Sequence, residues 1–115
     1  MRFFLRFLLC WGFSFVSVNA FAQIYKSDAI VSFYAGDFHG KKTSNGEYFD
    51  MNAMTCASKN FPFDSILKVT NLANGKSVQV RVNDRGPFVP NRELDLSLAA
   101  AKKLDMIKAG TIHAK

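Results

Sequence analysis

The sequence predicts a small domain of mainly β structure, a closed barrel of short strands with one short helix. At 115 residues the chain forms one domain at most. Apolar and polar side chains alternate along residues 77–83, and an Asn-Gly turn pair precedes this run. A short alanine-rich segment after Ser97 is the one helical pattern found in the sequence. Closing the sheet into a barrel suits such a chain because it leaves no exposed strand edge.

Residues 1–22 have the pattern of a secretory signal peptide and are expected to be absent from the folded domain. Arg2 and Arg6 supply the positive start, and the run behind them is almost wholly apolar. Small residues then stand at the positions that a signal peptidase reads. We expect cleavage after Ala22, with cleavage after Ala20 as the alternative.

An uncleaved membrane anchor is the competing interpretation of the same segment. The apolar run is shorter than the roughly 20 residues that a membrane-spanning helix requires. Cys10 lies inside the run instead of just behind it, so lipid attachment is not expected. We therefore predict an exported protein, periplasmic or secreted, with no integral membrane segment after signal removal.

The expected domain, residues 23–115, has an ordinary charge and a single cysteine. Residues 1–22 carry two of the 15 basic residues and none of the nine acidic ones, so their removal lowers the net charge from +6 to +4. With no charge run and with export expected, a nucleic-acid partner is not predicted. Cys56 has no partner for a disulfide, and its small neighbours favour a buried residue over a reactive thiol.

The first elements of the domain are a strand, a long loop and a hairpin. Residues 29–35 (AIVSFYA) are rich in strand formers, and the polar, glycine-punctuated stretch behind them predicts a loop of functional length. Residues 66–71 predict a second strand. The pair Asn74-Gly75 predicts a tight type I′ turn from this strand into residues 77–83.

The last elements are one helix and one closing strand. Asp95 and Ser97 both suit a helix start, and the alanine-rich run behind them places apolar side chains on one face. The helix is expected to stop by Gly110, because glycine commonly follows a helix end. Residues 111–115 then have room for one strand.

A Gly-Pro turn directly after the strand 77–83 predicts a site. Asp84 stands at the strand end, and Gly86 and Pro87 restrict the turn behind it. The side chains of Asp84 and Arg85 are therefore expected to be held in a defined direction, as acid or base chemistry requires. The structural alternative is that Asp84 accepts backbone hydrogen bonds in the turn and pairs with Arg85.

From Ala29 to near the C-terminus the chain resembles the rare lipoprotein A (RlpA) family. The motifs that carry the resemblance are SFYAGDFHGKKTSNGEYFDMNAMT (32–55), FPFDSILKVTNLANGKSVQVRVNDRGPF (61–88) and RELDLSLAAAKKL (92–104). The resemblance implies a six-stranded double-psi β-barrel with one short helix. It also implies an exported lytic transglycosylase that acts on peptidoglycan and prefers peptide-free glycan strands. Similar barrels occur in expansins, barwin-like proteins and endoglucanases, so the fold alone does not define the activity.

The resemblance also implies catalytic positions. Asp84 is the aspartate of the family's DRGP motif, and Glu47 retains the glutamate of its NGE motif. Ser58 stands where the family has a histidine, and serine does not titrate near neutrality, so it is a candidate only for holding a water or a sugar hydroxyl. Smaller departures are Asp64, where glycine is usual, and Cys56, where alanine is usual.

Cleavage by such a family member requires proton transfer at the scissile bond. A carboxyl group first protonates the leaving glycosidic oxygen and then accepts a proton from the sugar's own 6-hydroxyl, which yields a 1,6-anhydro sugar. Asp84 is the candidate for both steps, and its pKa is then expected to be raised. Asp95 or Glu47 would contribute a like charge that raises it, whereas Arg85 would oppose the shift. For Glu47 the alternative is a solvated loop carboxylate.

Further side chains are candidates for glycan binding: Arg85, Asp95, Tyr34, Thr43, Asn45, Lys59 and Arg92. Helix capping is the alternative for Asp95, and core packing is the alternative for Tyr34. A solvated surface is the alternative for Lys59 and Arg92. The two histidines, His39 and His113, belong to no metal-binding spacing, so we predict neither a metal site nor a cofactor.

Two functions from different classes remain open. The first is a lytic transglycosylase that uses Asp84. The second is an expansin-like module that binds peptidoglycan or loosens the wall without breaking a bond, as the replacement of the family histidine by Ser58 suggests. Peptidoglycan glycan strands are the expected partner in both cases, and the sequence identifies no protein partner.

Overall fold

The structure, a computed structural model, describes residues 24–34 and 38–115. The predicted signal peptide, residues 1–22, lies outside the described residues. In the part of the chain that is described, no helix is both long enough and apolar enough to cross a membrane.

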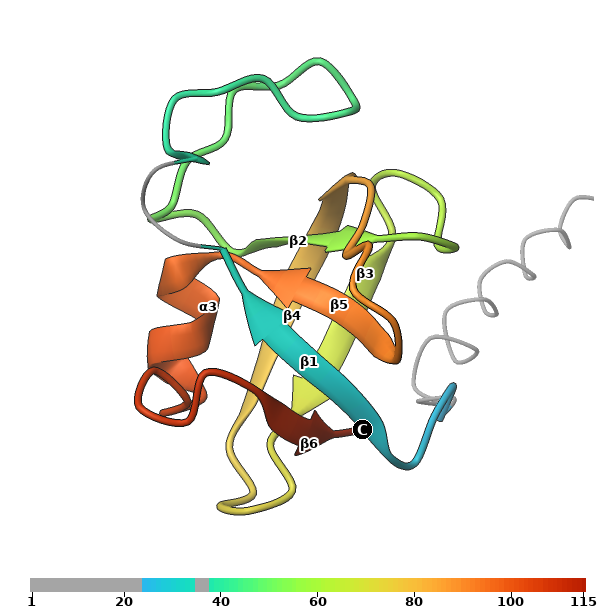
Figure 1. Cartoon of the computed structure of the whole chain (residues 1–115), viewed down its shortest axis with the longest axis vertical. Helices are drawn as coiled ribbons and strands as arrows, with labels where there is room; N and C mark the ends of the chain where they lie inside the picture. The colour runs from blue at the N-terminus through green and yellow to red at the C-terminus, as the bar shows by residue number, and fades with distance from the viewer. Residues whose placement is uncertain (1–23, 35–37) are drawn as a thin grey trace, which may run out of the picture.

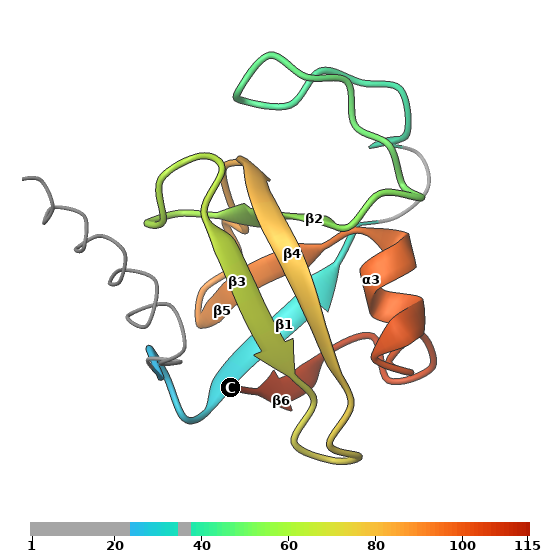
Figure 2. The same ribbon diagram turned by 180° about the vertical axis from the view of Figure 1, so that it is seen from behind.

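The described chain forms a mixed sheet that curls around one core (Figure 1). Its elements are β1 (Ala29–Phe33), β2 (Thr55–Ser58), β3 (Ile66–Thr70), β4 (Ser77–Asp84), β5 (Arg92–Leu96), α3 (Leu98–Lys103) and β6 (Ile112–Ala114). The strand order is β3-β4-β2-β5-β1-β6. The pairs β1–β5 and β2–β4 are parallel, and the other neighbours are antiparallel. Figure 2 shows the β3–β4 hairpin crossing in front of β1 and β5.

The two edges of the sheet meet at one end. Thr70 and Lys115 exchange backbone hydrogen bonds of 2.7 and 3.0 Å, and the N–H of Leu72 donates to the carbonyl of His113 at 3.0 Å. These bonds join the end of β3 to β6, so fewer backbone groups remain unpaired at the edges. The predicted fold class, a mainly β barrel of six strands with one short helix, is confirmed in the described residues.

Each strand contributes to a single main core. In β4 the buried valines at 78, 80 and 82 alternate with more exposed polar residues, as the sequence pattern predicts. Leu96, Leu104 and Met106 are fully buried against them. Cys56 is also fully buried, which confirms the structural interpretation of this thiol. Its burial raises the pKa of Cys56 to about 12, so the thiol stays protonated near neutrality.

The hairpin is confirmed, but the prediction of a type I′ turn is wrong. A type I′ turn needs positive φ at both central residues. In the loop 71–76 the backbone of Gly75 has φ 77°, whereas Asn74 does not have a positive φ. The loop is longer and is closed by the N–H of Gly75, which donates to the carbonyl of Asn71 at 2.8 Å. The amides of Asn71 and Asn74 both donate to the carbonyl of Leu104, at 2.9 and 3.1 Å, which ties the hairpin to the helix end.

The N-cap of helix α3 is Ser97 and not Asp95. The hydroxyl of Ser97 accepts a hydrogen bond from the N–H of Ala100 at 3.2 Å, which is the N-cap arrangement. Asp95 lies inside β5, so the helix-capping alternative for this residue is wrong. The helix is capped at its other end by Leu104, well before Gly110.

Candidate active site

One row of side chains crosses four strands on the same face of the sheet. Ser32 of β1 is paired with Asp95 of β5, Asp95 with Ala57 of β2, and Ala57 with Asp84 of β4. Paired residues on neighbouring strands point to the same face. The Cα atoms of Asp84 and Asp95 are therefore two strand spacings apart, about 10 Å. Ala57 of β2 lies between the two carboxyl-bearing strands, and Tyr34 packs in the same buried cluster as Ala57.

Asp84 is held by four hydrogen bonds. Its Oδ1 accepts from the hydroxyl of Ser44 at 2.7 Å, from the N–H of Ser44 at 2.9 Å and from the N–H of Arg85 at 2.8 Å. Its Oδ2 accepts from the hydroxyl of Tyr34 at 2.8 Å. Burial acts to raise the pKa of Asp84, but these donors outweigh it and lower the pKa below its ordinary value. The expectation of a raised pKa for Asp84 is therefore wrong.

Asp95 has the opposite electrostatic character. Burial raises the pKa of Asp95 above its ordinary value. A hydrogen bond from the hydroxyl of Ser32, at 3.1 Å, and the charge of Arg92 oppose this shift, while the charge of Asp84 adds to it. Asp95 and Asp84 thus face the same side of the sheet with pKa values displaced in opposite directions. Both residues are half-buried.

Tyr34 positions Asp84 and belongs to a small second core. The tyrosine is 8% exposed, and its ring stacks on Phe49 with centroids 4.6 Å apart. Phe38 packs edge-on at 5.7 Å. Burial and the hydrogen bond to Asp84 raise the pKa of Tyr34, so its hydroxyl remains a donor. The structure thus favours core packing, and not stacking on a sugar, for this ring.

Glu47 is part of an ion-paired anchor. Both of its oxygens accept from the guanidinium of Arg81, at 2.7 and 2.8 Å, and the amides of Asn83 and Asn45 add bonds of 3.2 and 3.0 Å. Arg81 is the main cause that lowers the pKa of Glu47 to about 2. A carboxylate of this kind does not supply a proton near neutrality. Its expected part in raising the pKa of Asp84 does not apply, because that pKa is lowered.

Thr43 and Asn45 build a tight turn. The hydroxyl of Thr43 donates to the side-chain oxygen of Asn45 at 2.6 Å, and that oxygen also accepts the N–H of Glu47 at 3.1 Å. The N–H of Thr43 donates to the carbonyl of Glu47 at 2.7 Å. The structure therefore uses these two predicted glycan-binding side chains inside the turn that presents Ser44.

Ser44 is the functional residue that sequence reasoning missed. The one available indication was its place in the polar TSNG segment, where serine commonly bonds to nearby backbone groups. That segment gives no sign that Ser44 reaches a strand end 40 residues later in the chain.

Ser58 lies outside the row. It is paired with Leu94 and follows Ala57 in β2, so its side chain points to the opposite face of the sheet. It is 2% exposed, and its Oγ accepts the N–H groups of Asn60 and Phe61 at 3.2 and 3.1 Å. The structure therefore assigns this hydroxyl to a turn instead of to a substrate.

Arg85 points away from Asp84. Its guanidinium donates to the carbonyls of Ser58 at 3.0 Å and Phe61 at 2.8 Å and lies 4.0 Å from the centre of the Phe63 ring. Only its backbone N–H contacts Asp84. The predicted pairing of the two side chains is wrong, and Arg85 instead joins the turn after β2 to the loop after β4.

The remaining candidates are dispersed. Lys59 is exposed, and Arg92 is partly buried and acts on Asp95 through its charge. His39 accepts the N–H of Met51 at 3.2 Å. Over residues 24–34 and 38–115, no three or more His, Cys, Asp or Glu side chains gather in a way that would hold a metal ion.

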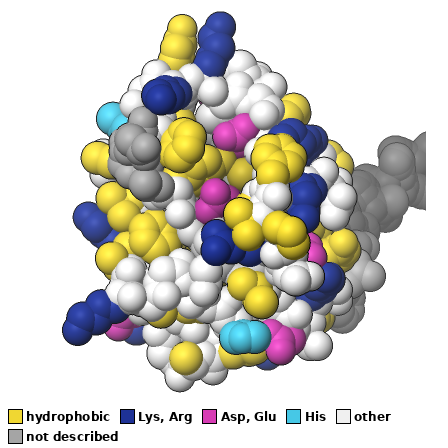
Figure 3. All heavy atoms as spheres, in the orientation of Figure 1, with side chains coloured by type: hydrophobic (Ala, Val, Ile, Leu, Met, Phe, Trp, Pro, Cys, Tyr) yellow, Lys and Arg dark blue, Asp and Glu magenta, His cyan; other side chains and the backbone are white. Residues whose placement is uncertain are grey.

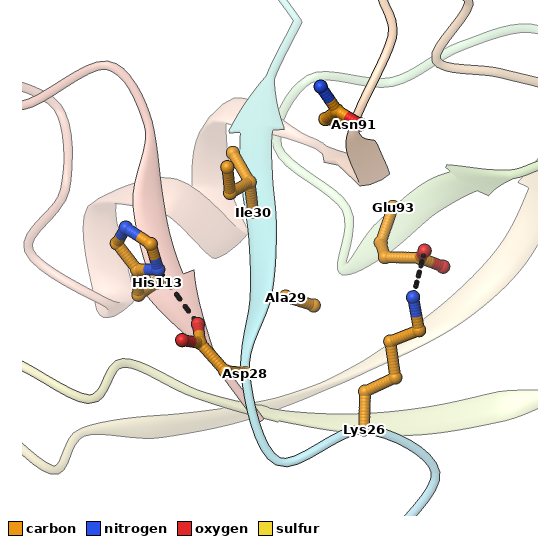
Figure 4. A pocket seen from close by; sticks show the side chains of 7 residues that line it. All are labelled: Lys26, Asp28, Ala29, Ile30, Asn91, Glu93 and His113. Atoms are coloured by element: carbon orange, nitrogen blue, oxygen red, sulfur yellow. Dashed lines mark hydrogen bonds and ion pairs between the residues drawn. The ribbon is translucent and has the colours of Figure 1, made fainter.

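Two hollows of the described surface lie away from this row. The smaller encloses about 300 Å³ and contains the ion pair of Lys26 with Glu93 and the hydrogen bond between Asp28 and His113, on either side of β1 (Figure 4). The larger, of about 890 Å³, is lined mainly by β3 and by the residues before and within β1. Neither lining includes Asp84 or Asp95. In Figure 3, acidic side chains lie among hydrophobic and basic ones on the face seen in Figure 1.

Comparison with known proteins gives one family and several relatives. A family model described as "Lytic transglycolase" matches residues 18–115. The endolytic peptidoglycan transglycosylase RlpA of Campylobacter jejuni is 60% identical over 85 residues, which cover 74% of this chain and 31% of the relative. The protein of the same name from Neisseria meningitidis is 60% identical over 84 residues, 73% of this chain and 35% of the relative.

A third relative and one solved structure extend this comparison. The endolytic peptidoglycan transglycosylase RlpA of Pseudomonas aeruginosa is 52% identical over 94 residues, 82% of this chain and 28% of the relative. The chain thus spans about a third of the length of the curated relatives that it matches. The Streptomyces papain inhibitor superposes with a TM-score of 0.58 at 21% identity, covering 76% of this chain and 87% of that protein. This likeness concerns the fold alone.

Proposed function

Since the chain belongs to the lytic transglycolase family of double-psi β-barrel proteins, we propose that it is an exported, endolytic peptidoglycan transglycosylase. One observation carries the proposal: Asp84 and Asp95 face the same side of the sheet with pKa values displaced in opposite directions. Two carboxyl groups with separated pKa values are suited to act as base and acid in one reaction.

The sequence led us to expect that Asp84 alone acts as proton donor and proton acceptor. The opposite pKa shifts of Asp95 and Asp84 support a division of these two roles between them. Asp95, with the raised pKa, donates a proton to the glycosidic oxygen as the bond from that oxygen to C1 breaks. Asp84, as the carboxylate, stabilises the positive charge that develops at C1. It then accepts the proton of the sugar's 6-hydroxyl as that oxygen bonds to C1. The product is a 1,6-anhydro sugar, and no water is consumed. Asp84 then releases the accepted proton to solvent and Asp95 takes one up, so both residues return to their starting states.

Ser44 and Tyr34 position the base. Together they donate three hydrogen bonds to the Asp84 carboxylate. Tyr34 directly follows β1, and Ser44 lies in the long loop between β1 and β2. These donors hold the carboxylate in one orientation and in its ionised form before substrate binds. The anchor between Glu47 and Arg81 holds the turn that carries Ser44.

The test is digestion of peptide-free glycan strands by the purified protein, with mass spectrometry of the fragments. We expect fragments with 1,6-anhydro ends from the wild type and their loss in Asp84→Asn and in Asp95→Asn. Asp105→Asn is the matched control, because this exposed aspartate lies beyond the helix and outside the row. Full activity of Asp95→Asn would show that the proton donor is wrongly assigned.

A glycan-binding module without bond cleavage is the second candidate. The position of Ser58 favours it, because a hydroxyl buried in a turn replaces the imidazole that the family resemblance leads one to expect. Sedimentation of the wild type with the same glycan strands, together with the absence of anhydro fragments, would support this module and contradict the enzyme.

A further inference from the structure

Phe88 has the greatest exposure among the large hydrophobic side chains of the described chain, at 81%. It lies in the loop between β4 and β5, four residues after Asp84. Val89 and Pro90, which follow it, are exposed as well. A single exposed apolar side chain is ordinary, but three in succession, beginning four residues after Asp84, need a reason.

The base of this loop is anchored, so Phe88 does not project from a loose tip. Gly86 and Pro87 are buried, and the guanidinium of Arg85 bonds two carbonyls of the turn after β2. The ring of Phe88 packs beside Gly86, since a Cβ placed on that glycine would lie 3.5 Å from the ring. The rest of the Phe88 ring is exposed to solvent.

We propose that Phe88 is a stacking platform for one pyranose ring of a glycan strand, next to the sugar held at Asp84 and Asp95. The inference rests on the proposed function and names a binding contact for the same substrate. One face of a pyranose ring presents several C–H groups, which pack well on the face of an aromatic ring. A glycan strand bound at Asp84 continues as a chain of pyranose rings, so a ring next to the one at Asp84 can stack on Phe88.

A sugar fits this surface better than a protein partner does. Specific protein interfaces bury at least about 1,200 Å² in total. The side chains of Phe88, Val89 and Pro90 alone present much less than that area. A single exposed aromatic ring in the loop that leaves Asp84 instead matches a narrow ligand with apolar faces and polar edges.

The test uses tryptophan fluorescence at position 88. The one tryptophan of the sequence, Trp11, lies in the predicted signal peptide, so Phe88→Trp places a single indole in the processed domain, at the platform. Asp84→Asn is included in every protein compared, so that the glycan is bound but not cleaved. On titration with peptide-free glycan strands we expect a saturable change in emission. In matched calorimetry we expect about a tenfold higher Kd for Phe88→Ala.

Further variants separate stacking from simple burial and from misfolding. Phe88→Leu retains the apolar volume without the ring and is expected to bind as weakly as Phe88→Ala. Leu72→Ala, an exposed apolar residue in the hairpin loop, is the control and is expected to bind as the wild type does. Equal Kd values for Phe88→Ala and the Phe88 protein would overturn the platform. An altered sedimentation coefficient with unchanged glycan affinity would overturn it too, and would indicate a protein interface.

The two proposals fail in different ways. If the wild type releases anhydro fragments and Phe88→Ala has the same kcat/KM, only the platform is wrong. If the wild type neither cleaves nor binds glycan strands, both the proposed function and the proposed role of Phe88 are wrong.

Discussion

The hydroxyl and the backbone N–H of Ser44 both donate to one oxygen of Asp84, at 2.7 and 2.9 Å. Their donor turn lies 40 residues earlier in the chain and is held to the barrel by the ion pair of Glu47 with Arg81. The protonation of the catalytic candidate is thus set by a separate segment, and this relationship leads to the first prediction.

Ser44→Ala is expected to move the acidic limb of the kcat/KM profile to higher pH. The pKa of Asp84 is lowered in the folded protein, and activity is expected to fall as pH drops through that pKa. Removing the hydroxyl removes one donor to the carboxylate, so the pKa rises and the fall occurs at a higher pH. Ser27→Ala, at an exposed serine that precedes β1 and is not a member of the row, is the control. An unchanged limb would show that Ser44 does not set the protonation of Asp84.

Glu47→Gln is expected to lower the free energy of unfolding in a pH-dependent way. The folded-state pKa of Glu47 is about 2 against an ordinary value of 4.5, so its contribution is present above pH 4.5 and is lost as pH falls toward 2. Because the pair is partly exposed and screened by solvent, we expect a loss of about 1 kcal/mol at pH 7.

Urea unfolding at pH 7 and pH 3 measures this difference. The gap in midpoint between wild type and Glu47→Gln is expected to shrink at the lower pH. A gap of the same size at both values would argue against the ion pair as its cause.

Ser58→Ala is expected to reduce stability without reducing catalysis per folded molecule. The substitution leaves the N–H groups of Asn60 and Phe61 without their acceptor, which costs about 1–2 kcal/mol. Thermal unfolding and digestion of glycan strands at low temperature measure the two properties separately. Loss of cleavage with unchanged stability would instead assign Ser58 a direct role.

Asp64→Gly is expected to be less destabilising than Asp64→Ala. Asp64 has φ 71°, in the left-handed region that favours glycine, and its carboxylate bonds Arg81 at 2.9 Å. Both variants lose that bond, but only glycine relieves the backbone, so we expect alanine to be about 1 kcal/mol the worse. Urea midpoints measured side by side provide the comparison, and equal midpoints would contradict the strain at this position.

The strands that the sequence predicted are those with a periodic pattern. The alternation along 77–83 requires one buried face, and the structure confirms it in β4. β2 was not located, because all four of its residues are buried and such a strand shows no alternation. β5 was obscured by Asp95, which read as a helix start because carboxylates are common there.

In the candidate site, too, the sequence identified residues whose surroundings only the structure revealed. Motif positions led to Asp84, Asp95 and Glu47 as candidates, but residue type alone did not separate their roles. Asp95 is half-buried and accepts a hydrogen bond from Ser32, 63 residues away, and Glu47 is ion-paired with Arg81, 34 residues away. Each role follows from which strands lie side by side, and this cannot be read from local pattern.

The sequence by itself determined the β4 strand, the hairpin, the short helix and the carboxylates near the turn after β4. It did so because periodicity, turn residues and side-chain chemistry act between near neighbours in the chain. Only the tertiary structure decided that Asp84 is stabilised as the ion, that the pKa of Asp95 is raised, and that Ser58 is withdrawn from the site. The physical reason is that burial and hydrogen-bond donors come from distant segments, as the contact of Tyr34 with Asp84 across 50 residues illustrates.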